Sequence, residues 1–166
     1  MAANRLSELV RTVKQWTFHD QGERHDVDLV TVVEDSLTLL RHKAGNTRVR
    51  RSLPESAWVA GRGGELGQVV TNLLDNAFDA ARTEVMVSII EGPDEVSVIV
   101  CDDGPGVPPE VEARIWEPFF TTKPPGKGTG LGLALSQRIA SDHGGSLVLQ
   151  SQPGDTRFEL RIPKPQ

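Results

Sequence analysis

The chain has 166 residues, enough for one domain with a substantial core and a short additional segment. Its formal net charge of -5 gives no net positive field for a nucleic-acid backbone, so we expect no nucleic-acid binding. A single cysteine, Cys101, excludes a disulfide within the chain and favours a reducing compartment. No apolar run approaches the ~20 residues that cross a bilayer, so we expect a cytoplasmic chain without a membrane segment.

The first expected helix covers residues 2–18. Leu6, Leu9, Val13 and Trp16 follow one another at steps of three and four residues, which is typical of a helix packed on another helix. A helix of this length is marginal alone in water, so we expect it to have a partner. A homodimer through this helix is one interpretation.

A polar linker then leads to Asp28, the expected N-cap of a helix over residues 29–43. A strand is expected at residues 47–53 and ends at Pro54. The strongest helical pattern in the chain covers residues 65–81. Its apolar stripe consists of Leu66, Val69, Val70, Leu73, Leu74 and Ala77.

The second half of the chain contains one further long helix, at residues 131–143, and strands at residues 84–91, 95–101, 146–151 and 156–162. The segment 103–128 is rich in glycine and proline, with a possible short helix at residues 109–115. A loop this long within a compact domain is usually functional, and we interpret it as a lid. The order of elements predicts a two-layer α/β sandwich, with a mixed sheet covered by helices on one face.

Polar side chains border the apolar stripe of the helix at residues 65–81. Glu65, Asn72, Asn76 and Asp79 are seven, four and three residues apart, and each step returns close to the same angle on a helix. An amide oxygen such as that of Asn76 is a hard, neutral ligand that suits Mg2+ bound together with nucleotide phosphates. For this helix taken alone, a solvated polar edge is an equally good explanation.

The motif DDGPG at residues 102–106 follows an expected buried strand. The Asp102 carboxylate can accept a hydrogen bond from the exocyclic amine of adenine, which distinguishes adenine from guanine. Gly104 and Gly106 would let the backbone turn and approach the base closely. A simple Asp-Gly turn between two strands is the alternative.

The motif GTGLG at residues 128–132 leads directly into a helix, so free N–H groups and the positive end of the helix dipole would face an anion such as a triphosphate. It is not a P-loop, because no Gly-Lys-Ser or Gly-Lys-Thr closes it. Lys123 and Lys127 are either phosphate ligands of the closed lid or solvated lid residues. Phe119 and Phe120 fit an apolar anchor of the lid better than a role in base stacking.

In chain order, the segments NLLDNAFDA, DDGPG, EPFFTTK and GKGTGLGL resemble the N, G1, F and G2 boxes of the GHKL superfamily of ATP-binding domains. Among its branches the chain looks most like the catalytic domain of a two-component sensor histidine kinase, and FFTTK is similar to kinases related to nitrogen regulation. The resemblance implies ATP and Mg2+ as cofactors, with Mg2+ at Asn76 and adenine at Asp102. It places these residues around the nucleotide: Asn72, Asn76, Asp79, Asp102, Gly104, Gly106, Val107, Lys123, Lys127, Gly128, Thr129, Gly130, Leu131, Gly132 and Thr156.

Position 72 separates the branches of the superfamily. The gyrase, Hsp90 and MutL branches have a glutamate there that activates water, and the anti-sigma serine kinases also have an acid. Asn72 cannot act as a general base, which favours transfer of the γ-phosphoryl group to a histidine. We therefore expect Asn72 and Lys123 to serve this transfer, with relay to a response-regulator aspartate; an anti-sigma-type serine kinase or a non-catalytic ATP-binding regulator is the alternative.

The resemblance also divides the chain. Residues 25–166 look like the catalytic domain, and residues 1–24 look like the C-terminal part of a dimerisation and phosphotransfer helix with its linker. His19 precedes an acid, but the expected helix ends there, so it is a poor phosphoacceptor. The other histidines lie in the linker or at expected helix ends: His25, His42 and His143. We expect the phosphoacceptor on the hairpin of a parent or partner kinase, outside this chain.

Overall fold

The computed structural model describes residues 6–7, 10, 13–14 and 22–166. The described residues before position 15 are helical, and Leu6 and Val13 are exposed. The other positions of the helix predicted at residues 2–18 lie outside the described residues, as does His19. Within the described part of the chain, no helix is both long and apolar enough to cross a membrane.

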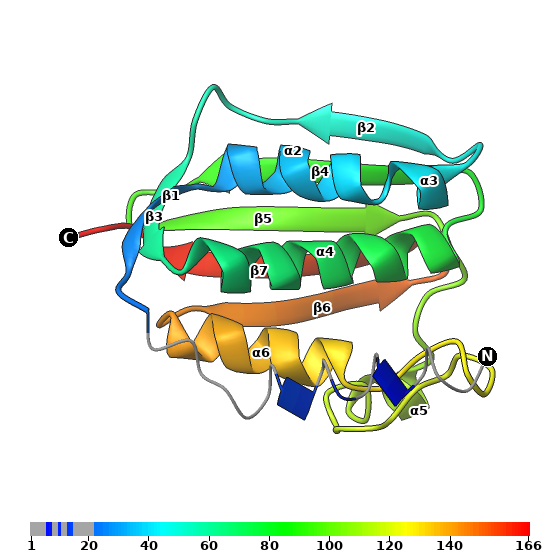
Figure 1. Cartoon of the computed structure of the whole chain (residues 1–166). Helices are drawn as coiled ribbons and strands as arrows, with labels where there is room; N and C mark the ends of the chain where they lie inside the picture. The colour runs from blue at the N-terminus through cyan, green and yellow to red at the C-terminus, as the bar shows by residue number, and fades with distance from the viewer. Residues whose placement is uncertain (1–5, 8–9, 11–12, 15–21) are drawn as a thin grey trace.

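A five-stranded mixed sheet forms one layer of the molecule (Figure 1). Its first two neighbours are parallel and its other three pairs are antiparallel. In order across the sheet, the strands are β2 (Arg48–Ser52), β4 (Glu84–Glu91), β5 (Glu95–Asp102), β7 (Asp155–Pro163) and β6 (Ser146–Gln152). All five were predicted from the sequence to within a few residues.

Three helices cover one face of this sheet: α2 (Leu29–Leu39), α4 (Gly63–Ala80) and α6 (Gly132–Asp142) (Figure 1). The six residues of the apolar stripe predicted for α4 are all buried, so this helix provides the centre of the core. The two layers confirm the predicted α/β sandwich with helices on one face.

The start of α2 depends on one carboxylate. Asp28 accepts hydrogen bonds from the N–H groups of Val30 at 3.0 Å and Ala57 at 2.9 Å, so it caps the helix as predicted and also holds the segment before β3. The helix predicted at residues 29–43 is two helices, because Leu40 has a φ of -97° and a ψ of 8°, away from helical values. The second piece is the short α3 (Arg41–Ala44).

A second sheet of two antiparallel strands, β1 (His25–Asp28) and β3 (Trp58–Gly61), lies at one end of the sandwich. The residues of β1 were expected to lie in a polar linker, which was wrong, and β3 was not predicted. Each strand has only four residues, so neither shows a clear alternation, and their pairing joins distant parts of the chain.

The lid loop between β5 and α6 contains the short helix α5 (Pro109–Glu112), near the position predicted for it. Ile115 is buried, and the Trp116 ring meets the Phe158 ring edge to face with centroids 6.2 Å apart. These contacts fix the first half of the loop on the sheet.

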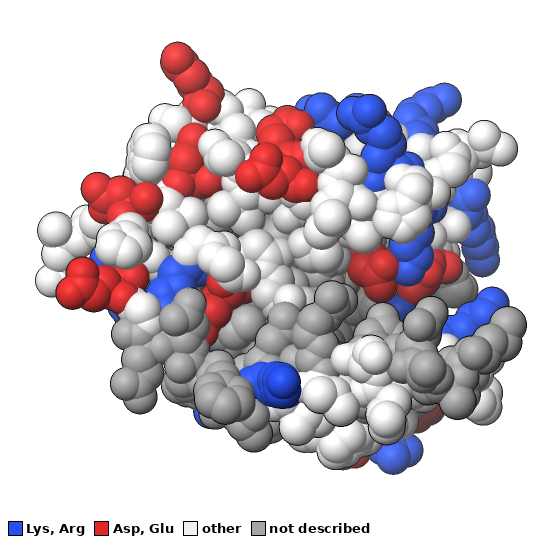
Figure 2. Space-filling model, viewed as in Figure 1, with Lys and Arg blue, Asp and Glu red and all other residues white. Residues whose placement is uncertain are grey.

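The basic cluster of Arg48, Arg50 and Arg51 lies on β2, at the edge of the sheet where Figure 2 shows lysine and arginine side chains gathered. Arg48 and Arg50 pair with Glu84, and Arg51 pairs with Glu34 at 3.2 Å. These acids neutralise part of the positive charge of the cluster.

Candidate nucleotide-binding site

The predicted site residues come from five segments: the second half of α4, the end of β5, the loop between β5 and α6, the start of α6, and the start of β7 (Figure 1). The structure joins α4 to α6 through Asn72 and Gly132, and α4 to the lid through Asn76 and Lys123. Many of the predicted residues belong to one of two groups that differ in construction, a strand-end site and a lysine cluster.

The strand-end site consists of Asp102, Gly104, Gly106, Ser151 and Thr156. Asp102 is the last residue of β5, lies opposite Thr156 on β7, and is only 7% exposed. Its Oδ1 accepts a hydrogen bond from the N–H of Gly104 at 2.9 Å, and its Oδ2 has no hydrogen bond within the described residues. Burial raises the pKa of Asp102, although the Gly104 hydrogen bond opposes the rise. A buried carboxylate oxygen without a donor is suited to an N–H group of a ligand.

The two glycines of this site are required by the backbone. A Cβ atom on Gly104 would collide with the carbonyl oxygen of Ala80, at the end of α4. Gly106 has a φ of 84°, and a Cβ there would lie 3.0 Å from the carbonyl oxygen of Gln152. The predicted tight turn is present, and it packs against α4 on one side and β6 on the other.

Ser151 was not among the predicted site residues. Its Oγ accepts a hydrogen bond from the N–H of Val107 at 2.7 Å and lies 3.5 Å from the Oγ1 of Thr156. It therefore links the start of the lid to the last hairpin. Nothing in the sequence distinguished Ser151 from other polar residues of β6, because the β6–β7 register brings it to the site.

Asp103, the second carboxylate of the DDGPG motif, has a structural role. It accepts hydrogen bonds from the N–H groups of Arg82, Thr83 and Glu84 and from the Thr83 hydroxyl. These bonds, the Thr83 hydroxyl first, hold the pKa of Asp103 well below its usual range. Asp103 therefore fixes the turn between α4 and β4.

Asn72 joins α4 to α6. Its amide Nδ2 donates to the carbonyl oxygen of Gly132 and to the Oγ of Ser136, each at 3.2 Å, and its Oδ1 accepts from Gln68 at 3.0 Å. All its polar atoms have partners, so Asn72 orients the two helices that border the site.

The lysine cluster consists of Lys43, Asp75, Asn76, Asp79 and Lys123. The Lys123 Nζ lies 3.2 Å from the Asn76 Oδ1 and 2.5 Å from the Asp79 Oδ2. The Lys43 Nζ lies 2.7 Å from the Asp79 Oδ1 and 2.5 Å from the Asp75 Oδ1. The cluster joins α3, α4 and the lid.

Opposite charges within the cluster stabilise its ionised forms. Burial would raise the pKa of Asp79, but hydrogen bonds from Lys123 and Lys43 lower it below its usual value. Burial would likewise lower the pKa of Lys43, but Asp75 and Asp79 raise it. Lys43 was missed by the sequence analysis, because no spacing relates a residue of α3 to a row on α4.

The glycine-rich segment turns sharply into α6. Gly130 has a φ of 70°, its carbonyl oxygen accepts from the Phe119 N–H at 2.8 Å, and a Cβ there would collide with the Phe119 backbone. The Leu131 N–H donates to the Thr129 Oγ1 at 3.3 Å, and among the described residues no side chain caps the N-terminus of α6. The beginning of α6 therefore retains the donors that favour an anion.

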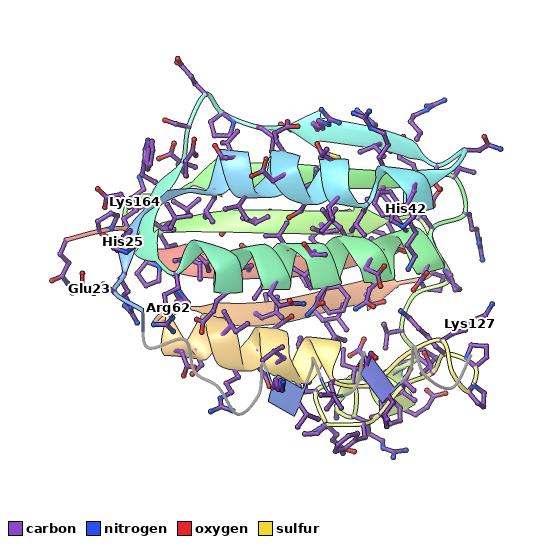
Figure 3. All side chains as sticks on the ribbon, viewed as in Figure 1. Glu23, His25, His42, Arg62, Lys127 and Lys164 are labelled. Atoms are coloured by element: carbon purple, nitrogen blue, oxygen red, sulfur yellow. The ribbon has the colours of Figure 1, made fainter. Side chains whose placement is uncertain are left out.

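The prediction that Phe119 and Phe120 anchor the lid was only partly right. Phe120 packs against the core beneath the Arg114 guanidinium, 4.5 Å from its ring centroid, but Phe119 is 67% exposed and does not anchor the lid. Phe119 adopts a φ of 69° to pair with Gly130, which turns its side chain outward. Lys127 is exposed at the far edge of the lid in Figure 3, so its role as a phosphate ligand stays a prediction.

Glu65 does not belong to the site, although the helical spacing placed it on the same row. It pairs with Arg62 at 2.7 Å at the opposite end of α4, 3.9 Å from the Nδ1 of His143. His143 is a helix-end residue as expected, the C-cap of α6, but its side chain is buried. It is 3% exposed, bonds to the Ile139 carbonyl oxygen at 2.8 Å, and accepts the Arg62 N–H at 3.1 Å. Burial lowers its pKa.

Comparisons with known proteins agree with this arrangement. The model of the histidine kinase-, DNA gyrase B-, and HSP90-like ATPases matches residues 61–166. The chain is 42% identical over 100 residues to the sensor histidine kinase GtrS of Pseudomonas aeruginosa, covering 60% of this chain and 21% of GtrS. It is 37% identical over 140 residues to the C4-dicarboxylate transport sensor protein DctB of Rhizobium meliloti, covering 80% of this chain and 22% of DctB.

A solved structure of the mycobacterial sensor histidine kinase MprB superposes with a TM-score of 0.77 at 29% identity, covering 86% of this chain and 99% of that one. The chain thus spans about a fifth of the length of GtrS and DctB but nearly all of the solved MprB chain.

Proposed function

The chain belongs to the histidine kinase-, DNA gyrase B-, and HSP90-like ATPase family, among the catalytic domains of sensor histidine kinases, and we propose that it binds ATP with Mg2+ and transfers the γ-phosphoryl group to a histidine. The observation that carries the ATP site is the Asp102 carboxylate, which is buried and has one oxygen that accepts no hydrogen bond from the residues that the structure describes. Adenine offers an amine at the position where guanine offers a carbonyl oxygen. The proposed base specificity follows from this difference.

In this proposal the nucleotide lies along the C-terminal half of α4. The base contacts Asp102, with Gly104, Gly106, Val107 and Thr156 around it. The phosphates approach the beginning of α6 and the glycine-rich segment at residues 128–132, where backbone N–H groups are directed to an anion.

Asn76 is the proposed ligand of Mg2+, which supplies charge neutralisation on the nucleotide phosphates. Its Oδ1 already faces a cation, the Lys123 ammonium at 3.2 Å, so the position accepts positive charge. Within the described residues no three His, Cys, Asp or Glu side chains gather into a metal site, so the proposed ligand set depends on the nucleotide phosphates.

Asn72 supports phosphoryl transfer over ATP hydrolysis. Its polar atoms are engaged with Gly132, Ser136 and Gln68, and an amide cannot take a proton from water at neutral pH. The chain's own contribution to the reaction is then position and electrostatic stabilisation. Lys123 is the proposed cation that approaches the phosphates.

The phosphoacceptor is proposed to lie on a helical hairpin of the parent or a partner kinase, with relay to a response regulator and a homodimer through residues 1–24. The similarity to sensor kinases several times longer than this chain supports these partners. Because β1 at His25 is the first strand among the described residues, the proposed domain boundary lies there. A reaction that consumes ATP also favours action in the cytoplasm.

The decisive experiment uses residues 1–166, γ-labelled ATP and Mg2+, with and without the hairpin of a related sensor kinase. We expect no label on the chain alone and an acid-labile phosphohistidine on the added hairpin. Acid-stable label on serine of a partner protein would favour the serine-kinase alternative, and binding without any transfer would favour a non-catalytic regulator. Acid-labile label on the chain alone, lost in His19→Ala, would overturn the placement of the phosphoacceptor outside it.

A further inference from the structure

One lysine of the lid reaches across to α4. The Lys123 ammonium contacts two acceptors one helical turn apart, the Asn76 Oδ1 at 3.2 Å and the Asp79 Oδ2 at 2.5 Å. The side chains of Lys123 and Asp79 are only 27% and 33% exposed, so the pair is partly shielded from water. The backbone of the lid supports this geometry, because the Lys123 N–H donates to the Thr121 Oγ1 at 3.1 Å.

The Asp79 carboxylate is fixed from its other side. Its Oδ1 lies 2.7 Å from the Lys43 Nζ, and Lys43 also holds Asp75 at 2.5 Å. Asp79 therefore lies between two ammonium groups, one from α3 and one from the lid. Two lysines and two aspartates balance in charge, so the cluster is complete without a nucleotide.

Because both are positively charged, a metal ion and the Lys123 ammonium cannot both occupy the position at the Asn76 Oδ1. A divalent cation at the Asn76 Oδ1 would stand within a few ångströms of the Lys123 ammonium, and like charges at that distance repel strongly in a partly shielded site. A nucleotide brings phosphate oxygens that the displaced ammonium can pair with instead. Metal binding at Asn76 and release of Lys123 are therefore coupled events.

We propose that Lys123 is a tethered cation that fills the metal position of the nucleotide-free chain and holds the lid on α4 until Mg2+ bound to nucleotide displaces it. This inference rests on the proposed function and deepens it. Lys43 acts as a positioning residue, because it keeps the Asp79 carboxylate in place while one cation replaces the other.

The lid half of this proposal is tested without nucleotide. Amide hydrogen exchange over residues 119–128 is measured for the wild type, Lys123→Met and the matched control Lys127→Met. We expect exchange to become roughly two- to five-fold faster in Lys123→Met, the range for a partly exposed ion pair, and to stay unchanged in Lys127→Met. Unchanged exchange in Lys123→Met, or equal acceleration in both variants, would overturn the tether.

The metal half is tested by calorimetry with Mg2+ in the absence of nucleotide, a condition in which the lysine has no phosphate to pair with. Because Lys123→Met removes the competing cation, we expect the variant to bind Mg2+ roughly two- to five-fold more tightly than the wild type. Equal or weaker Mg2+ binding by the variant would mean that Lys123 does not compete with the metal, and would overturn the displacement. If the wild type binds no ADP at all, the proposed function fails, while the exchange experiment still decides on the tether.

Discussion

The strand-end site and the lysine cluster both contact the C-terminal half of α4, and they are built differently. The strand-end site uses the last residues of β5 and β7, with backbone atoms packed so closely that Gly104 has no room for a Cβ. The lysine cluster uses flexible side chains from α3, α4 and the lid, each ion pair partly exposed. The first can be rigid before a ligand arrives, whereas the second can exchange partners.

This difference has an electrostatic counterpart. Burial raises the pKa of Asp102, so its ionised form disfavours the folded state, whereas lysine neighbours lower the pKa of Asp79, so its ionised form favours folding. A carboxylate whose ionised form destabilises the folded state is a better candidate for ligand recognition than one that is paired with lysines within the fold. The variants below test this comparison, from the largest expected effect to the smallest.

Replacing the buried carboxylate should have the largest effect on binding. Asp102→Asn keeps the shape and the Oδ1 acceptor but directs an amide donor at the adenine amine, so we expect ADP affinity to fall by about 10- to 100-fold, the value of a hydrogen bond to a charged group. Folding stability should not decrease. Calorimetry and denaturant unfolding measure the two quantities, and Asp103→Asn is the control that should lose stability but keep affinity. Equal ADP affinity in wild type and Asp102→Asn would refute the adenine assignment.

The rigidity of the strand-end site is tested with a methyl group. Gly104→Ala would place a Cβ against the Ala80 carbonyl oxygen, and we expect a loss of about 2 kcal/mol in the free energy of unfolding. Gly67→Ala, in the middle of α4 with nothing within 4 Å of its Cβ, should instead stabilise by up to about 1 kcal/mol. Urea denaturation measures the free energy of unfolding of both variants. Equal stability of the two variants would show that the turn at Gly104 yields easily.

A substitution in the lysine cluster should change the affinity for Mg2+ with nucleotide rather than the recognition of the base. Asn76→Ala removes the proposed Mg2+ ligand, so we expect roughly a five- to ten-fold loss of affinity for Mg2+ with ATP and little change for metal-free ATP. Calorimetry with Mg2+ and with a chelator separates the two affinities. Equal losses in both conditions would assign Asn76 to the nucleotide and remove it as the metal ligand.

The sequence predicted helices and strands well where a pattern of apolar residues extends over many positions. The apolar stripe from Leu66 to Ala77 predicted α4, because a helix buried on one face has apolar residues at regular spacing. The motif at Asp102 predicted the end of β5. Gly104, Gly106 and Gly130 were also identifiable, since tight backbone turns demand glycine.

The sequence could not predict contacts that depend on tertiary register. Ser151 reaches the start of the lid only because β6 pairs with β7 in one register, and Lys43 reaches Asp79 only because α3 packs beside α4. The spacing that grouped Glu65 with Asn76 was correct as helix geometry, but it carried no information on which end of the helix borders the site. Short strands such as β1 have too few residues to show an alternation of apolar and polar side chains.

The smallest expected effect concerns His143, which belongs to the rigid framework at the end of α4 away from the site. Its Nε2 accepts the Arg62 N–H, and its Nδ1 faces the Ile139 carbonyl oxygen, so the buried ring is neutral with the proton on Nδ1. Burial lowers its pKa below the ordinary value of 6.5; the Ile139 carbonyl and Glu65 oppose this, and Arg62 and Arg24 reinforce it. Below about pH 6.5 the unfolded chain takes up a proton that the folded chain does not, so stability must fall as pH falls from 6.5 toward the lowered pKa.

We expect the urea midpoint of the wild type to drop between pH 7 and pH 5 by more than that of His143→Gln, which retains an acceptor but does not titrate. His25 and His42 are exposed and present in both proteins, so the difference between the two slopes isolates His143. Hydrogen exchange in the lid should not accelerate before the framework unfolds, because His143 lies away from the lysine cluster, which contains no histidine. If the urea midpoint changed equally with pH in the two proteins, the pKa of His143 would be the same in the folded and unfolded states, contrary to the prediction. Early loosening of the lid would show that the framework and the lysine cluster are not independent.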